Sequence, residues 1–127
     1  MIENEVGRII VDASIKVHRA LGPGLFESVY ERVLAYELSL RKLRLECQVD
    51  IPIEYDGIKL EGGFKADIVV ENIVIIELKS VASILPVHKK QLQTYLKLSG
   101  CKLGFLLNFN ANLMKDGIIR CVSNLAE

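Results

Sequence analysis

Residues 102–109, KLGFLLNF, form an apolar run in which hydrophobic side chains do not alternate with polar ones. A strand of this kind is buried on both faces, because both faces carry apolar side chains. It therefore belongs inside a sheet that is covered by helices on each side. Apolar residues at helical spacing predict those helices over residues 2–21, about 25–42 and 86–100.

Residues 47–70 are predicted to form a β-hairpin. Residues 47–55 alternate strictly, which predicts a strand with one buried face. The residues expected on that face are Cys47, Val49, Ile51, Ile53 and Tyr55. Asp56-Gly57 is a two-residue turn signal. The returning strand, 58–70, contains Gly62-Gly63, which we interpret as a bulge.

Two more strands complete the expected architecture. Residues 73–79 follow a turn at Glu71-Asn72, and residues 118–122 follow a turn at Asp116-Gly117. The predicted order of elements is ααβββαββ, an α/β fold with a mixed sheet flanked by helices. We expect a single domain over residues 1–127, because the chain is of ordinary domain length and has no linker or repeat.

The composition excludes several classes of protein. Lys and Arg number 16, as do Asp and Glu, so any nucleic-acid binding must come from a local patch. No apolar run suits a membrane span, and the acidic N-terminus does not resemble a signal peptide. Three cysteines without a CxxC pair indicate reduced core residues of a cytoplasmic protein. Half of the chain is hydrophobic, which leads us to expect an exposed apolar patch and a homodimer.

Charged residues stand at both ends of the apolar stretch KADIVVENIVIIELKS, residues 65–80. Glu77 and Lys79 share one face of their strand, and Asp67 lies on the strand before it. Two converging carboxylates repel unless a divalent cation lies between them, and oxygen ligands favour Mg²⁺ or Mn²⁺. Together with a lysine, this set suits metal-assisted hydrolysis of a phosphodiester. The alternative is a salt bridge from Lys79 to either carboxylate, and spacing alone favours that alternative.

The length of the turn at Glu71-Asn72 determines whether the carboxylates of Asp67 and Glu77 lie on the same face of the sheet. A two-residue turn places Asp67 opposite Ile76 and therefore on the face away from Glu77. A three-residue turn, or one bulge, places Asp67 opposite Glu77. The metal hypothesis therefore predicts an odd-length turn, for which Asn72 can supply the left-handed conformation.

Four motifs occur in an order that resembles a known family. Asp67 followed by Glu77-Leu78-Lys79 resembles the PD-(D/E)xK nuclease superfamily, with Ala66 in place of the proline. Gln91 and Tyr95 resemble the Q-x-x-x-Y signature of its exonuclease-type branches. GLFESVY, residues 24–30, fits the G-x-x-E-x-x-Y stretch of the GxxExxY protein family, and the likeness extends over residues 17–120.

This resemblance implies a nuclease-like fold and a set of roles. Asp67, Glu77 and the carbonyl of Leu78 would bind Mg²⁺, and Lys79 would position water or offset charge on the phosphate. Glu27, in the first turn of its helix, would be an accessory metal ligand or an orienting residue; its alternative role is to stabilise the helix N-terminus. Gln91 and Tyr95 would support the site. The alternative is a surface glutamine and a core tyrosine, and the spacing of the two residues taken alone favours that alternative.

The resemblance also implies a nucleic-acid substrate, with DNA favoured. Two other functions remain open from the sequence, because fold does not fix function. One is a catalytically inactive module of the same fold that binds nucleic acid or protein. The other is a structural protein in which Asp67, Glu77 and Lys79 form only a salt-bridged edge. Metal binding would distinguish the structural protein from the nuclease and the inactive module. Cleavage would then distinguish the nuclease from the inactive module.

Overall fold

The structure of the protein is a computed structural model that describes residues 2–126. Its five strands form one mixed sheet in the order β1-β2-β3-β4-β5, with β3 and β4 parallel and all other neighbours antiparallel. The strands are β1 (Leu45–Tyr55), β2 (Ile58–Val70), β3 (Val74–Lys79), β4 (Leu103–Asn108) and β5 (Ile118–Val122). The mixed sheet confirms the predicted fold class.

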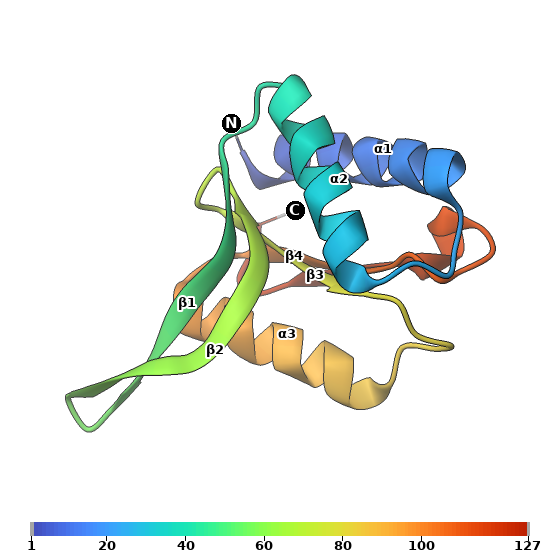
Figure 1. Cartoon of the computed structure of the whole chain (residues 1–127). Helices are drawn as coiled ribbons and strands as arrows, with labels where there is room; N and C mark the ends of the chain where they lie inside the picture. The colour runs from blue at the N-terminus through green and yellow to red at the C-terminus, as the bar shows by residue number, and fades with distance from the viewer. Residues whose placement is uncertain (1, 127) are drawn as a thin grey trace.

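Helices cover the sheet on both sides (Figure 1). Two pack on one face and the third packs on the other. The helices are α1 (Glu3–Leu21), α2 (Glu27–Leu40) and α3 (Pro86–Ser99), with a short 3-10 turn, η1 (Met114–Gly117), before β5. The order ααβββαββ is thus confirmed. None of the described helices is long and apolar enough to cross a membrane.

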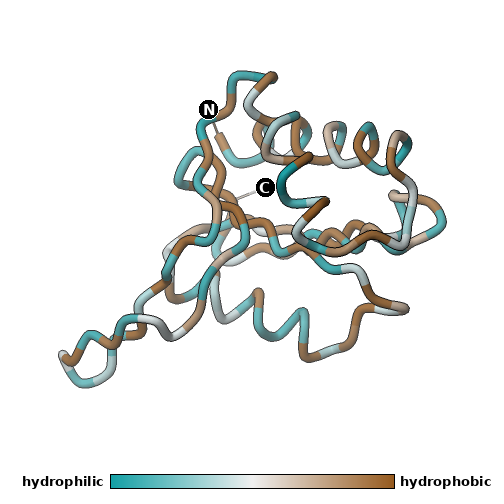
Figure 2. The backbone as a smooth tube through the Cα atoms, viewed as in Figure 1, coloured by the Kyte–Doolittle hydropathy of each residue, from teal (hydrophilic) through white to brown (hydrophobic). Residues whose placement is uncertain are grey.

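Strand β4 is buried along its whole length, as its unbroken apolar pattern predicts. Its residues Leu103, Phe105 and Leu107 pack in the core beneath α1 and α2, whereas Leu106 packs on the α3 side. Gly104 allows α3 to approach closely, since a Cβ there would lie only 3.0 Å from Leu92 Cδ1. The apolar residues of the central strands are visible as brown segments in the middle of the molecule (Figure 2).

The β1–β2 hairpin projects away from the helices (Figure 1). Asp56 and Gly57 form its turn with φ of 51° and 78°, and the pairing register shifts between Ile51 and Ile53, opposite Gly62-Gly63. The predicted turn and bulge are therefore confirmed.

The predicted buried face of β1 is wrong in part. Cys47 is exposed, so it is not a core residue, and Tyr55 is 69% exposed. Alternation indicates that two faces differ, but not that either face is covered. Tyr55 lies beside the turn at the tip of the arm, whereas Cys47 lies at its base, next to Gln48, whose φ of 54° departs from strand geometry. Apolar and polar residues continue to alternate out to its tip in solvent (Figure 2).

Tyr30 fixes the loop that leads from α1 into α2. Its buried hydroxyl donates to Gly22 O at 2.6 Å and accepts from Leu25 N at 3.1 Å. Its ring stacks on Phe109, with 4.6 Å between the ring centroids. Tyr30 is therefore a core residue that sets the position of the chain just before Glu27.

We expect Tyr30→Phe to lower the free energy of unfolding by about 1–3 kcal/mol, because the Gly22 carbonyl and the Leu25 N–H both lose a partner. The ring stacking on Phe109 is retained, so the change isolates the hydroxyl. Urea unfolding measures the difference. Tyr36→Phe is the matched control, because Tyr36 is exposed. An equal loss in the two variants would contradict this account of the loop.

Candidate active site

The turn between β2 and β3 has three residues, Glu71 to Ile73. Val70 pairs with Val74, Val69 with Ile75 and Ile68 with Ile76. Continuing this register places Asp67 opposite Glu77. The turn therefore has the odd length that the metal hypothesis predicts. Glu71 and Asn72 adopt φ of 52° and 58°, the left-handed conformation expected for Asn72.

The side chain of Glu71 holds this turn in place. Its Oε2 accepts a hydrogen bond from Arg44 N at 2.6 Å, and Glu71 N donates to Arg44 O at 2.8 Å. These bonds fix the strained residue against the start of β1. The register that aligns Asp67 with Glu77 thus depends on contacts outside the hairpin itself.

Asp67 is held by two hydrogen bonds that orient its carboxylate. Its Oδ2 accepts from Leu78 N at 2.8 Å, and its Oδ1 accepts from Gln48 Nε2 at 3.3 Å. The same Gln48 amide donates to Glu31 Oε1 at 2.6 Å. Gln48 therefore bridges a carboxylate of β2 and a carboxylate of α2.

Glu31 and Gln48 are site residues that the sequence interpretation missed. Glu31 follows Glu27 by one helical turn, so the spacing alone could have placed both on one face of α2. Burial raises the pKa of Glu31, the hydrogen bond from Gln48 opposes that rise, and the charge of Asp67 adds to it. Gln48 has φ of 54°, and no sequence signal predicts that for a glutamine.

Glu77 is buried without adequate compensation for a negative charge. The residue is 7% exposed, and its Oε1 has no hydrogen-bond partner among the described residues. Burial and then the charge of Asp67 raise its pKa to about 9, although the nearby Lys79 opposes that rise. Glu77 therefore holds a proton at neutral pH unless a cation compensates its charge.

Lys79 does not form the salt bridge that the simpler alternative requires. Among residues 2–126, no carboxylate oxygen lies within 4.0 Å of its Nζ. Its side chain shares the face of Glu77, because the two are separated by one residue on β3. The amine is thus free to contact another group at this edge of the sheet.

Glu27 lies at the end of β3 and is not seen in contact with Asp67 or Glu77. Its Oε2 accepts from Ser80 N at 3.2 Å, and the Ser80 hydroxyl donates to Leu25 O at 2.7 Å. The start of α2 is therefore fastened to the residue that follows Lys79. The structure brings Glu27 to the rim of the site and Glu31 to Asp67.

Helix α3 supplies the opposite wall of the site. Tyr95 stacks on Phe64, with 3.8 Å between the ring centroids. Burial raises the pKa of Tyr95, and so do the charges of Glu77 and Asp67. Gln91 is exposed one turn earlier, and both residues line a cavity of about 430 Å³ between α3 and the β1–β2 hairpin.

The donor set suits a hard divalent cation held by few protein ligands. In the described part of the chain, no group of three or more His, Cys, Asp or Glu side chains is arranged to hold a metal ion. The unpartnered Glu77 oxygen and the facing Asp67 nevertheless offer two carboxylates. The Leu78 carbonyl is directed to the same side as its N–H, which is bonded to Asp67. Such a sparse oxygen set, completed by water, fits Mg²⁺.

The chain was compared with solved structures, curated proteins and protein-family models. Among solved structures, the chain is similar to one titled "Crystal structure of SSO0001", with 19% identity, 95% of this chain and 79% of that chain covered, and a TM-score of 0.48. No curated protein matches the chain. The model of the PD-(D/E)XK nuclease superfamily matches residues 4–121, which include Asp67 and Glu77-Leu78-Lys79. The chain therefore belongs to the PD-(D/E)XK nuclease superfamily.

Proposed function

We propose that this protein is a metal-dependent nuclease that hydrolyses phosphodiester bonds of DNA or RNA with Mg²⁺ or Mn²⁺. The observation that carries the proposal is the buried Glu77 carboxylate, which has an unpartnered oxygen and lies opposite Asp67. A fold maintains such an arrangement at a cost in stability, because a buried acid without a partner is unfavourable. A cation bound between the two carboxylates compensates their charge and so removes this unfavourable contribution.

Asp67, Glu77 and the Leu78 carbonyl hold the cation in this proposal. When bound, it makes a neighbouring water more acidic and offsets the negative charge that develops on the phosphate. Lys79 orients the attacking water or donates to a phosphate oxygen from the same face of β3. Gln48 keeps Asp67 in position and ties it to Glu31.

The remaining site residues have supporting roles. Glu27 fixes the residue after Lys79 through its bond to Ser80 N. Gln91 and Tyr95 border the space in which the substrate would lie, and the Tyr95 ring is held by Phe64. Their contribution is to position the substrate and the catalytic groups, which affects the rate without direct participation in the chemistry.

The proposal extends to assembly and location. Tyr55, Ile58 and Leu60 are exposed on the projecting hairpin and support self-association as a homodimer. The three cysteines are free, which supports a reducing compartment such as the cytoplasm. Light scattering at high concentration tests the dimer, and a monomer there would contradict it.

The test of the proposed activity is cleavage of labelled linear duplex DNA, single-stranded DNA and RNA. We expect the wild type to cut at least one of them with Mg²⁺ or Mn²⁺ and none with EDTA, and Asp67→Asn to be inactive. Equal activity in wild type and variant would indicate a contaminant. Binding of nucleic acid without cleavage by the wild type would favour the alternative of an inactive module.

A further inference from the structure

Two cavities are lined by successive parts of the same two segments. The segments are the loop between α1 and α2 and the residues that follow β4. The first cavity, of about 550 Å³, is lined in part by Phe26, Glu27, Ser80 and Asn110. Ser80 directly follows Lys79, so this cavity lies at the C-terminal end of β3, the strand that carries Glu77 and Lys79.

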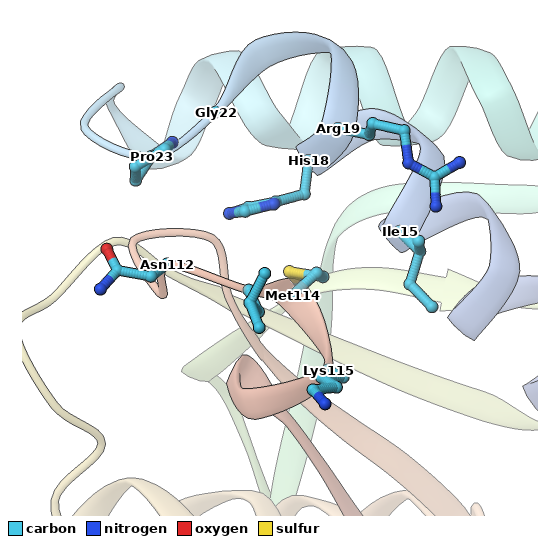
Figure 3. Close-up of a pocket in the computed structure, with 9 residues that line it drawn as sticks. Ile15, His18, Arg19, Gly22, Pro23, Asn112, Met114 and Lys115 are labelled. Carbon is cyan, nitrogen blue, oxygen red and sulfur yellow. The ribbon is translucent and has the colours of Figure 1, made fainter.

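The second cavity, of about 510 Å³, is lined by basic and apolar residues (Figure 3). Pro23 and Asn112 lie at one end, and Arg19 lies at the other. Arg19 comes from α1 and Lys115 from η1. No acidic side chain of the described residues lines this cavity.

The two cations of this cavity, Arg19 and Lys115, have no ion-pair partner in the described part of the chain. Arg19 and Lys115 are exposed, and neither is within 4.0 Å of a carboxylate of residues 2–126. Lys16 and Arg41, by contrast, are paired with Glu37. The cavity therefore presents uncompensated positive charge on a protein whose formal net charge is zero.

Phe26 is an exposed aromatic residue that lines the first cavity. The residue is 82% exposed although it is large and apolar. It lines the first cavity and is the residue directly before α2. A flat aromatic ring held in water at the rim of a cavity can stack on an unpaired nucleobase.

We propose that an unpaired nucleic-acid strand leaves the active site along these two cavities, with a base stacked on Phe26 and phosphates bound by Arg19 and Lys115. This inference rests on the proposed nuclease function and specifies its substrate as a single strand or a single-stranded flank. The side-chain amide of Asn112 adds a donor on the path between Phe26 and the cations.

Electrostatics explains why the cations lie outside the catalytic centre. Asp67 and Glu31 bring two carboxylates together through Gln48 at the site, and negative charge there repels phosphates unless a divalent cation is bound. Contacts to phosphates farther along the strand offset that repulsion and position the scissile bond. A base inside a duplex cannot stack on Phe26, because its faces are covered by its neighbours, so the path selects an unpaired strand.

The test is fluorescence anisotropy with a labelled oligothymidylate in EDTA at low salt, where no cleavage interferes. We expect Arg19→Ala/Lys115→Ala to weaken binding by about tenfold and to reduce the salt slope by about 1.4, because each lost phosphate contact contributes about 0.7. Phe26→Ala is expected to weaken binding by about tenfold without a change of slope. Phe26→Tyr is expected to bind like wild type.

Lys59→Ala/Lys97→Ala is the matched control, because it removes the same charge from exposed positions on β2 and late α3. Equal affinity of the two double variants would overturn the path, and so would equal binding of the single strand and its duplex. Absence of any binding by the wild type would overturn it as well. The proposed activity fails on a different result, namely no metal-dependent cleavage by the wild type.

Discussion

Replacing Lys79 with alanine is expected to slow metal-dependent cleavage by about 100- to 1000-fold, the effect of removing one well-placed group that stabilises charge in the transition state. The Mn²⁺ affinity should not fall with the rate. Lys79 is not a cation ligand in the proposed site, and its positive charge opposes the rise in the pKa of Glu77. Loss of that charge leaves Mn²⁺ affinity the same or makes it higher.

Single-turnover cleavage and calorimetric titration with Mn²⁺ measure the two effects separately. Lys59→Ala, on the projecting hairpin, is the control for the loss of one positive charge. Lys79→Arg keeps the charge but changes the geometry, and we expect it to recover only part of the rate. A Lys79→Ala variant that cuts at the wild-type rate would remove this lysine from the proposed mechanism.

Replacing Glu77 with glutamine is expected to stabilise the metal-free protein in alkaline solution by about 2 kcal/mol or more, since each unit of pKa shift corresponds to about 1.4 kcal/mol. Glutamine has nearly the same shape and carries no charge. Metal-dependent activity should be lost in the same variant. Stability and activity therefore change in opposite directions, as expected for a site that stores unfavourable charge.

The pH dependence has the opposite sign to that of an ordinary carboxylate. Glu77 has a pKa of about 9 in the folded protein, compared with the ordinary glutamate pKa of 4.5 that applies to the unfolded chain. Between these values the folded state binds more protons than the unfolded state, so the free energy of unfolding falls as pH rises. Wild type in EDTA should lose stability across this window, and Glu77→Gln should lack that contribution.

Urea unfolding at several pH values between about 5 and 9 measures this difference. Glu46→Gln, at an exposed position of β1, is the control and should follow the wild type. Mn²⁺ should restore stability to the wild type and not to Glu77→Gln. Parallel pH profiles for wild type and Glu77→Gln would contradict the assigned burial and charge of Glu77.

The sequence predicts the architecture well because burial leaves a clear pattern. The unbroken apolar run of β4 requires cover on both faces, and helical spacing supplies that cover on each side. From the sequence, whether Asp67 lies opposite Glu77 depends on the length of the turn between their strands, which the sequence does not fix. The turn has three residues because Glu71 and Asn72 both adopt the left-handed conformation, with Glu71 held by Arg44.

Other features depend on tertiary contacts that no local pattern encodes. The bridge from Glu31 through Gln48 to Asp67 requires the packing of α2 beside β1, which sequence spacing does not specify. Alternation in β1 cannot reveal which apolar side chains are covered. It predicts that Cys47, at the base of the hairpin, and Tyr55, at its tip, are buried, and both are exposed.

The most direct test of the central claim is calorimetric titration of the protein with Mn²⁺ near neutral pH, in two buffers of different ionisation enthalpy. The claim is that Asp67 and Glu77 hold one divalent cation between them. We expect binding with release of about one proton per ion, because Glu77 must give up its proton to become a ligand. Glu77→Gln and Asp67→Asn should lose most of the affinity. Absence of binding by the wild type, or equal binding by Glu77→Gln, would contradict the claim.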